Sequence, residues 1–261
     1  MTGLSCSVLR VEQRGAVRRL VLNRPAQRNA LDATLVDALT AALTDAEQHT
    51  ATRAVLLTGA GPSFCAGADL QHLLALAEAG RSPVPFLSTV SELTRRIERS
   101  PLPVVAVLHG HAVAGGLELA LACDAVLAEA GTLIGDGHIR NHLVPGAGAA
   151  VRMRRKLGDS LGRWLALTGE LLPAERFQAS GWLHAVVEPG HGTDAGHRVA
   201  ETLAAAANPA QAAFKTMLAE LDEQPSIEQG LHLELQAFDR HWARHDVPAE
   251  LRRFFTRRTA G

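Results

Sequence analysis

Cysteine and excess charge are both scarce in this sequence of 261 residues. Its three cysteines, Cys6, Cys65 and Cys123, form no CxxC pair, whereas a secreted disulfide scaffold or a structural zinc site would need more of them. Lys and Arg number 26 against 27 Asp and Glu, so the chain lacks the basic excess typical of proteins that bind nucleic acids or anionic membranes. The basic runs 152–156 and 252–258 are interpreted as solvated helix faces. We therefore expect no metal site and no nucleic-acid partner.

Long apolar runs and an export signal are also missing. The most apolar stretch, 112–130, is interrupted by Glu118 and Asp124, so we expect neither a membrane span nor a membrane partner. The chain begins without a basic segment followed by an apolar one, which predicts that it has no signal peptide. Together with the few cysteines, these absences predict a soluble protein in the reducing cytoplasm.

Hydrophobic residues make up 47% of the sequence, and charged residues only 20%. Such an apolar fraction is far too high for a disordered chain. A length near 260 residues is enough for one large domain or two small ones, and either can bury a substantial core. The sequence therefore predicts a folded, globular protein.

Strand patterns alternate with helical patterns over the first two-thirds of the chain. The expected strands, which are compact apolar runs bounded by turn residues, cover residues 7–11, 16–22, 54–57, 104–108, 125–127 and 185–187. Leu35, Leu39 and Leu43 recur at helical spacing and predict a helix over 32–49. Strands separated by helices indicate an α/β fold with right-handed crossovers.

Only helices are expected after about Thr193. They cover residues 195–207, 210–221, 227–244 and 248–258. Leu231, Leu235 and Phe238 fall on one face of the third of these helices. A helical tail with such a face must pack either on the core of its own chain or on a neighbouring subunit, so we expect an oligomer.

Two segments, 54–70 and 105–120, each run from a buried strand through small residues into a helical pattern. Small residues let the backbone come close to a ligand, and helix N-termini present N–H groups to developing negative charge. Two such loops facing each other could form an oxyanion hole. The alternative is that the small residues only allow a helix to pack closely on a sheet, and for one loop alone this alternative carries more weight. Neither segment matches GxGxxG or GxxxxGKS/T, which disfavours a dinucleotide or P-loop phosphate site.

The sequence resembles the crotonase, or enoyl-CoA hydratase/isomerase, superfamily over nearly its whole length. The matching segments occur in order along the chain, at 22–25, 28–31, 58–70, 105–125, 167–170, 181–183 and 254–258. Several ordered and spaced matches form a more specific signal than one motif. The resemblance implies an α/β fold in which residues 1–192 form a crotonase-like spiral of repeated ββα units that holds the active site. Residues 193–261 would form a C-terminal α-helical oligomerisation domain that builds a homotrimer or a dimer of trimers.

The resemblance implies an acyl-CoA thioester as the substrate, with coenzyme A as part of it and no separate cofactor. The thioester carbonyl would lie between the backbone N–H groups of Ala68 and Gly115, which would stabilise an enolate. One well-placed donor of this kind contributes roughly 3–4 kcal/mol. The positive end of the helix that Gly115 and Gly116 are expected to open would favour the same enolate.

The resemblance also implies contacts with the rest of the substrate. Arg28, Ala30 and Ala66 would lie near the nucleotide end of coenzyme A. Further residues expected to contact the substrate are Gly67, Asp69, Gly116 and Asp136. Gln71 stands where relatives often carry a lysine near the phosphates, so a weaker contact is expected there. The acyl chain is expected to contact the region 70–94.

Glu118 is the first candidate for acid–base chemistry. Hydratases of the family usually have two glutamates that flank the C2–C3 bond of the substrate, and Glu118, three residues after Gly115, matches the first of them. The alternative role is structural, because a carboxylate in the first turn of a helix complements the macrodipole by ~0.3–1 kcal/mol. The residues alone weight the two roles equally, and the resemblance favours catalysis.

The second glutamate is missing, and His138 occupies its position in the register set by Gly135 and Pro145-Gly146. A histidine titrates near neutral pH and can donate or accept a proton. Asp136, two residues earlier, would orient the ring or compete for its role. The alternative, that His138 lines a relaxed pocket without doing chemistry, carries about equal weight.

These residues leave four functions open. The leading hypothesis is an enoyl-CoA hydratase in which Glu118 activates or positions water and His138 moves the second proton. The second is an enoyl-CoA isomerase, in which one base shuttles a proton along the acyl chain. The third is a catalytically silent acyl-CoA-binding paralogue. The fourth, a β-diketone C–C hydrolase, is a minority interpretation, because Ala147 stands where that branch carries an aspartate after Pro-Gly.

Overall fold

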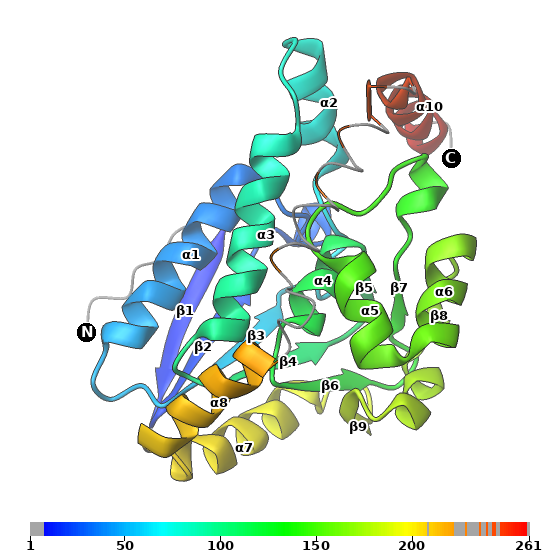
Figure 1. Ribbon diagram of the computed structural model, residues 1–261. Coiled ribbons are helices and arrows are strands. Elements are labelled where there is room, and N and C mark those ends of the chain that lie inside the picture. The colour runs from blue at the N-terminus through cyan, green and yellow to red at the C-terminus, as the bar shows by residue number, and fades with distance from the viewer. Residues whose placement is uncertain are drawn as a thin grey trace.

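A six-stranded sheet forms the centre of the protein (Figure 1). The computed structural model describes residues 8–207, 209–221, 228, 235, 239, 242–243 and 246–259. In sheet order the strands are β1 (Leu9–Arg14), β2 (Val17–Leu22), β3 (Ala54–Gly59), β4 (Val104–Leu108), β6 (Ala125–Glu129) and β9 (Leu183–Val187). β1 and β2 form an antiparallel hairpin, and the other neighbouring pairs are parallel. The six expected strands are confirmed, although Ser7, expected in the first, lies outside the described residues.

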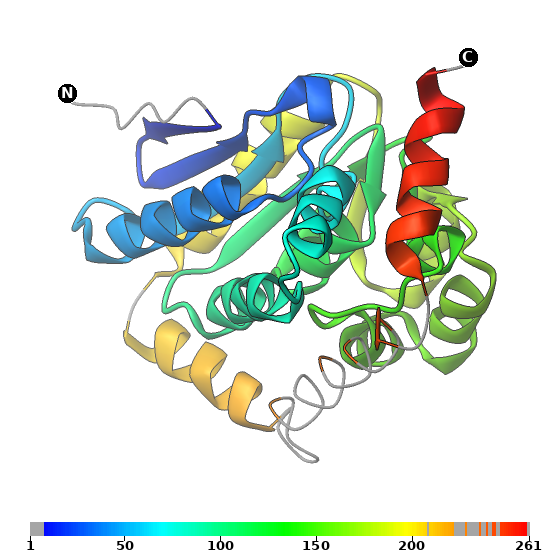
Figure 2. The same cartoon turned by 90° about the horizontal axis from the view of Figure 1, so that it is seen from above.

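Different helices cover the two faces of this sheet (Figure 2). On one face, α7 (Gly192–Ala205) packs small residues against β3 and β4. The approach is so close that a Cβ on Gly196 would lie 2.2 Å from a methyl group of Val107. On the other face, α1 (Ala33–Gln48) and α3 (Val84–Arg99) bury larger side chains, such as Leu39 and Val90. Burying a leucine or valine contributes about 1.5–3 kcal/mol, so the main core lies on this second face.

A second, three-stranded sheet has the order β5-β7-β8. Its strands are β5 (His111–Val113), β7 (Leu133–Gly135) and β8 (Leu172–Pro173). The sequence did not predict this sheet, because strands of two or three residues are too short to display an alternating pattern. The sheet fixes where α4 (Gly115–Leu121) and the 3-10 helix η2 (His138–Asn141) begin, since they follow β5 and β7 closely.

The helix predicted over 32–49 is confirmed as α1. Asp32 caps it, because its side chain accepts a hydrogen bond from Leu35 N at 2.8 Å. Further helices are η1 (Pro25–Gln27), α2 (Leu70–Glu78), α5 (Ala149–Leu157), α6 (Asp159–Thr168), η3 (Ala174–Ser180), α8 (Pro209–Leu221) and α10 (Val247–Thr259). The predictions for 195–207, 210–221 and 248–258 are thereby confirmed as α7, α8 and α10. The helix predicted at 227–244, with Leu231 and Phe238, lies largely outside the described residues.

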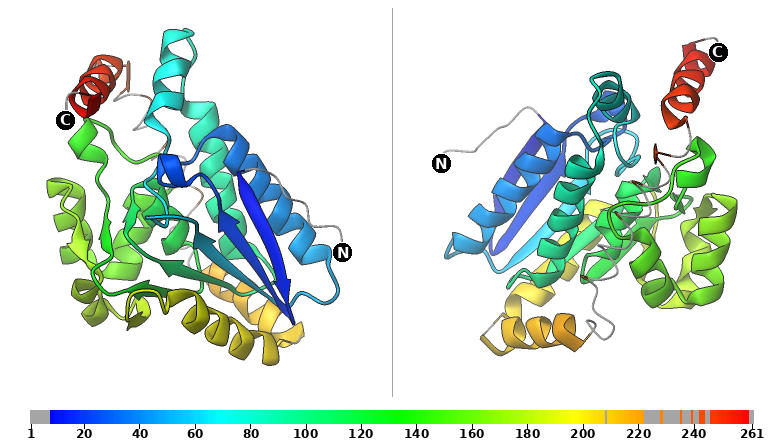
Figure 3. Two further views of the ribbon diagram at one scale, coloured as in Figure 1. Left: turned by 180° about the vertical axis from the view of Figure 1, so that it is seen from behind. Right: turned by 45° about the horizontal axis from the view of Figure 1, so that its top comes forward.

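The C-terminal helices are joined to the rest of the fold by specific contacts. Lys215 of α8 donates from Nζ to Ile97 O at 3.1 Å and to Leu102 O at 2.9 Å, and it pairs with Asp124 at 2.6 Å. α10 packs beside α2 and η2 (Figure 3). Within the described part of the chain, no helix is long and apolar enough to span a bilayer. The division into domains at residues 1–192 and 193–261 stays a prediction.

The interpretation of 152–156 as a solvated helix face is wrong for Arg152. Its side chain is only 1% exposed. The reason is the helical period: Arg152 lies on the same face of α5 as the buried Ala149, Met153 and Leu157. An arginine at that position must be paired inside the protein, and its partner is described below.

Candidate functional site

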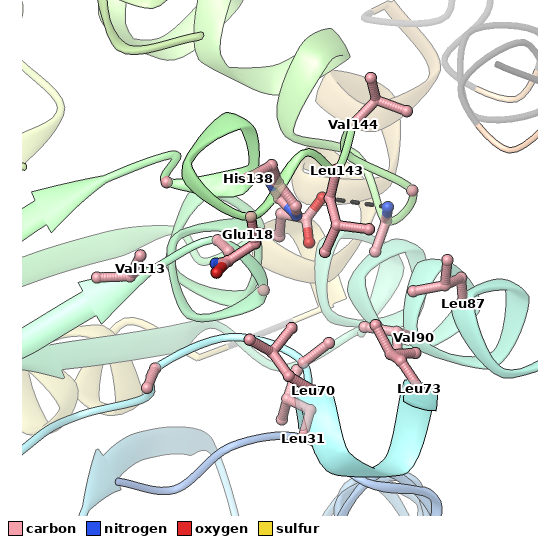
Figure 4. A pocket seen from close by; sticks show the side chains of 18 residues that line it. Leu31, Leu70, Leu73, Leu87, Val90, Val113, Glu118, His138, Leu143 and Val144 are labelled. Carbon is pink, nitrogen blue, oxygen red and sulfur yellow. Dashed lines mark hydrogen bonds between the residues drawn. The ribbon is translucent and has the colours of Figure 1, made fainter. Parts of the chain in front are cut away.

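A cavity of about 620 Å³, including its open mouth, lies among α2, α3, α4 and η2 (Figure 4). One part of its wall is apolar, with Leu70 and Leu73 from α2 and Leu87 and Val90 from α3. The other part carries polar groups. It is lined by Ala66, Ala68, Val113, Ala114, Gly115, Glu118, Gly137, His138 and Asn141. The cavity therefore brings together predicted site residues that come from three separate stretches of the sequence.

The two predicted loops meet at this cavity. Val113 N donates to Cys65 O at 3.0 Å, which joins the end of β5 to the loop after β3. Gly67, with φ +100°, packs so tightly that a Cβ on it would lie 2.9 Å from Ala114 Cβ. Glycine is required at such a position both by the backbone conformation and by the close approach.

The backbone N–H groups of Ala68 and Gly115 lie close together at this junction. A Cβ on Gly115 would lie 3.3 Å from Ala68 N. Leu31 bonds to the residues on either side of Ala68, at Gly67 O and Asp69 N, both at 2.8 Å. Gly115 is the first residue of α4, so its N–H has no acceptor within the helix. No described residue accepts a hydrogen bond from either N–H group, so both are available to a carbonyl oxygen in the cavity.

Ala114 has a strained backbone where the chain turns from β5 into α4. Its φ of +49° and ψ of −116° lie outside the regions that a residue with a Cβ normally adopts, which costs on the order of 1–3 kcal/mol. The surrounding structure holds this conformation, since Ala114 N donates to Gly135 O at 3.1 Å. The turn is what brings Gly115 against Ala68.

Glu118 lies one turn into α4 and is buried, with 2% exposure. Its Oε1 accepts hydrogen bonds from Ala147 N at 3.1 Å and Ala149 N at 3.0 Å. Its Oε2 accepts no hydrogen bond from the described residues. Because Glu118 also lines the cavity, Oε2 is the oxygen that a bound molecule would meet.

The pKa of Glu118 is raised above its ordinary value near 4.5, mainly because burial disfavours the charged carboxylate. The negative charge of Asp136 raises the pKa further, whereas His138 and the N–H groups of Ala149 and Ala147 lower it. A buried carboxyl with opposing influences of this kind is typical of acid–base sites.

His138 is oriented by Asp136. The ring Nδ1 lies 2.9 Å from Asp136 Oδ1, and Asp136 is buried at 2% exposure. An ionised carboxylate can only accept a hydrogen bond, so in a bond to an ionised Asp136 the ring donates from Nδ1. Asp136 does not line the cavity. Asp136 therefore lies at the Nδ1 side of the ring, where it can orient His138.

Two of the residues expected to contact the substrate also have partners within the fold. Asp69 caps α2 by accepting from the N–H groups of Gln71 and His72, at 3.0 and 3.3 Å. Its other oxygen pairs with Arg24 at 3.0 Å. A Cβ on Gly116 would lie 2.2 Å from Cys65 O, so this glycine permits the contact between the two loops.

Arg28 and Ala30 lie in the turn before α1 and do not line the cavity. Arg28 has a left-handed backbone with φ +50°, and its carbonyl accepts from Ala66 N at 3.0 Å. Ala30 O accepts a hydrogen bond from Arg24. The contacts with a substrate expected from the sequence all stay predictions, namely those of Arg28, Ala30, Ala66, Gly67, Asp69, Gly116 and Asp136.

The sequence missed a segment of the cavity wall that follows η2. It consists of residues without helical or strand structure, namely Leu143, Val144, Gly146 and Ala147. Asn141, at the end of η2, was also missed. An irregular segment has no periodicity to detect, and the one available signal was its position directly after His138.

Within the described ranges, no group of three or more His, Cys, Asp or Glu residues could hold a metal ion. The cysteines Cys65 and Cys123 are buried, and burial raises the pKa of each thiol to about 12. Such thiols are poor nucleophiles at neutral pH. Among the residues that line the cavity, Glu118 and His138 carry the side chains that can take or give a proton.

A family model described as enoyl-CoA hydratase/isomerase matches residues 12–260. The chain belongs to this family. A Rhizobium meliloti protein described as a probable enoyl-CoA hydratase is 30% identical over 261 residues, which cover 98% of each chain. The crystal structure of an enoyl-CoA hydratase from Mycobacterium tuberculosis is 35% identical with a TM-score of 0.78, over 93% of this chain and 99% of that one.

A crystal structure of an enoyl-CoA hydratase/isomerase from Xanthobacter autotrophicus aligns with a TM-score of 0.82 at 27% identity, over 91% of this chain and 88% of the other. These likenesses confirm the crotonase fold expected from the sequence. Members of the family act on acyl-CoA thioesters. Hydratases and isomerases both occur in the family, so the reaction has to be argued from the site.

Proposed function

We propose that this protein is an enoyl-CoA hydratase, which adds water across the double bond of a 2-enoyl-CoA. One observation carries the proposal: a single cavity is lined by two adjacent backbone N–H donors, a buried carboxyl and a histidine that a carboxylate orients. These are the groups needed to polarise a thioester and to move two protons.

The N–H groups of Ala68 and Gly115 would bind the thioester oxygen. When the oxygen of water bonds to C3, the electrons of the double bond move toward the thioester, and negative charge develops on that oxygen as an enolate. Each well-placed donor would lower the barrier by roughly 3–4 kcal/mol. The unpaired state of both N–H groups supports this role, because they need no rearrangement before the reaction.

Glu118 and His138 would move the protons. The ionised Glu118 would take a proton from the attacking water, and a protonated His138 would give one to C2, which restores the thioester. The sum is the addition of one water molecule, and proton exchange through solvent resets the two groups. Asp136 would stabilise the charged imidazole, while burial makes Glu118 a stronger base. General acid–base groups of this kind each contribute about 10²–10⁴-fold.

The apolar part of the wall supports a hydrocarbon chain as the variable part of the substrate. Leu70, Leu73, Leu87 and Val90 offer no charge or hydrogen bond to that end of the cavity. All four lie in the region 70–94 where the sequence placed the acyl chain. Arg28 and Ala30, near Ala66, remain the proposed contacts for the nucleotide end of coenzyme A.

A homotrimer or a dimer of trimers is proposed as the assembly. Large apolar side chains exposed on η2 and α6 support it, among them Trp164 at 53% and Leu167 at 71% exposure, since a second copy could bury them. Sedimentation velocity tests this directly. A sedimentation coefficient of a monomer that does not change with concentration would contradict it.

Incubation with crotonoyl-CoA in heavy-oxygen water, followed by mass spectrometry of the product, tests the reaction. Labelled oxygen in the product is expected, and its loss in Glu118→Gln would tie it to this site. The absence of the second glutamate is the observation that most favours an isomerase.

A shifted double bond without added oxygen, from a 3-enoyl-CoA, would therefore favour that alternative. Binding of acyl-CoA without turnover would favour a silent paralogue, and failure to bind coenzyme A would favour the hydrolase.

A further inference from the structure

The segment that holds Glu118 in place has no regular structure of its own. Ala147 and Ala149 supply the N–H groups that bind Glu118 Oε1. Residues 143–148 form neither helix nor strand, and α5 begins only at Ala149. The position of the Glu118 carboxyl therefore depends on whatever fixes this segment from behind.

The side chain of Arg152 fixes it. Its Nη1 donates to Ala147 O at 3.1 Å. Thr94 Oγ1 lies 3.3 Å from the same oxygen, but a hydroxyl has one proton, and Thr94 has a shorter bond to Ser91 O at 2.8 Å. Arg152 is thus the main donor to Ala147 O among the described residues.

Glu98 of α3 fixes Arg152 in turn. Arg152 Nε lies 2.8 Å from Glu98 Oε1, and Nη2 lies 2.7 Å from Oε2. Two parallel bonds between a guanidinium and a carboxylate hold both groups in one plane. The pair with Glu98 therefore fixes the orientation of the guanidinium, and its remaining nitrogen, Nη1, is held in position to donate to Ala147 O.

We propose that Arg152, clamped by Glu98, is a positioning residue for Glu118. It holds the Ala147 carbonyl so that the N–H groups of Ala147 and Ala149 stay aligned on Glu118 Oε1. The part of this inference that concerns turnover rests on the proposed function. The part that concerns the state of the Glu118 carboxyl does not.

The inference predicts a direction for the pKa of Glu118. The groups that act on this carboxyl are the thiol of Cys65, Asp136, His138 and the two N–H groups. The N–H groups stabilise the charged form and lower the pKa. Loss of their alignment must therefore raise the pKa further, and the acidic limb of a pH–rate profile must move to higher pH.

The sharpest test replaces both members of the ion pair, in Glu98→Leu/Arg152→Met. This double variant removes one positive and one negative charge, so the net charge near Glu118 is unchanged, and it does not leave Glu98 as a carboxylate without its partner. Arg152→Lys is the second variant, because it keeps the charge but lacks the fork that reaches two partners at once. Arg154→Met is the matched control, since Arg154 lies on the same helix, is exposed and pairs with Asp159.

The pKa of Glu118 is measured by NMR of carboxyl-labelled glutamate, with Glu118→Gln to assign the signal, alongside kcat and KM for crotonoyl-CoA. In the double variant we expect a higher pKa for Glu118, a kcat lower by about tenfold to a hundredfold, and a KM within about threefold of the original. Arg152→Lys should also raise the pKa of Glu118 and lower kcat, each by less than the double variant does. Arg154→Met should change neither quantity.

An unchanged pKa and kcat in a folded double variant would overturn the inference. So would an equal change in Arg154→Met, because the effect would then be a general one. If the original protein yields no hydrated product, the proposed function fails, but the comparison of Glu118 pKa values still decides whether Arg152 positions this carboxyl.

Discussion

Two glutamates, the partly buried Glu98 and the buried Glu118, lie on opposite sides of one short loop and have very different surroundings. Both oxygens of Glu98 face the guanidinium of Arg152. Glu118 has no cation in hydrogen-bond contact among the described residues: backbone N–H groups hold one oxygen, and the other is left to the cavity. The carboxylate of Glu98 has both oxygens engaged by one permanently charged partner, whereas that of Glu118 keeps one oxygen for a molecule in the cavity. This difference is why we assign a structural role to Glu98 and propose a chemical one for Glu118.

The largest effect expected from breaking this comparison is the loss of activity in Glu118→Gln. Glutamine keeps the oxygen that accepts from Ala147 and Ala149 but cannot take a proton, so we expect kcat to fall by about 10³-fold. Steady-state kinetics with crotonoyl-CoA measures this. Glu92→Gln on α3 is the matched control, because Glu92 is exposed and pairs with Arg95. Full activity in Glu118→Gln would contradict the assignment.

The next largest expected effect is a loss of stability when the pair of Glu98 with Arg152 is broken. In Arg152→Met the carboxylate of Glu98 loses its partner, and we expect the free energy of unfolding to fall by about 3–5 kcal/mol. The double variant Glu98→Leu/Arg152→Met should recover much of this loss, since the carboxylate of Glu98 is removed together with its partner. Denaturant unfolding of both variants measures the difference. Equal stability of the single variant and the original would mean that the pair contributes little.

The influence of His138 on Glu118 can be measured through the pH dependence of the reaction. We expect His138→Gln to lower kcat by about 10²-fold. The positive charge of His138 lowers the pKa of Glu118, so its removal must raise that pKa. The acidic limb of the pH–rate profile should therefore move to higher pH. A profile with the same acidic limb as the original would show that the two groups do not interact.

The smallest expected effect is a gain in stability from Glu118→Gln. The pKa of Glu118 is raised in the folded protein, so the ionised carboxyl disfavours folding. This cost is absent below the ordinary pKa near 4.5 and is complete above the raised one. We expect Glu118→Gln to be more stable at pH 8 by on the order of 1 kcal/mol, with no difference at pH 4. A variant less stable at pH 8 would contradict the role of burial.

The parts of the site that sequence could predict are local in the chain. Gly115 and Glu118 are one helical turn apart, and Asp136 and His138 are two residues apart, so short-range geometry brings each pair together. The apposition of Ala68 with Gly115 came from the family resemblance rather than from spacing. Physical patterns alone had left close packing as the stronger explanation of a single glycine loop.

The pairing of Arg152 with Glu98 shows what sequence reasoning could not reach. The two residues are 54 positions apart, and nothing in the pattern of α3 marks one of its glutamates as the partner of a buried arginine. The run of basic residues suggested a solvated surface instead. A helical projection would have indicated the burial, because Arg152 lies beside Ala149 at the edge of the apolar side of α5.

Residues of α3 a few turns apart have two different roles. Leu87 and Val90 form part of the wall of the cavity, and Glu98 anchors Arg152. A helix moves as a rigid rod, so a bulkier or smaller side chain at the wall that shifts α3 also displaces the anchor. With Arg152 positioning Glu118 as proposed, substitutions at the α3 wall are expected to shift the pKa of Glu118 as well. Variants with altered chain preference are best sought on α2, whose Leu70 and Leu73 face the same space without carrying that anchor.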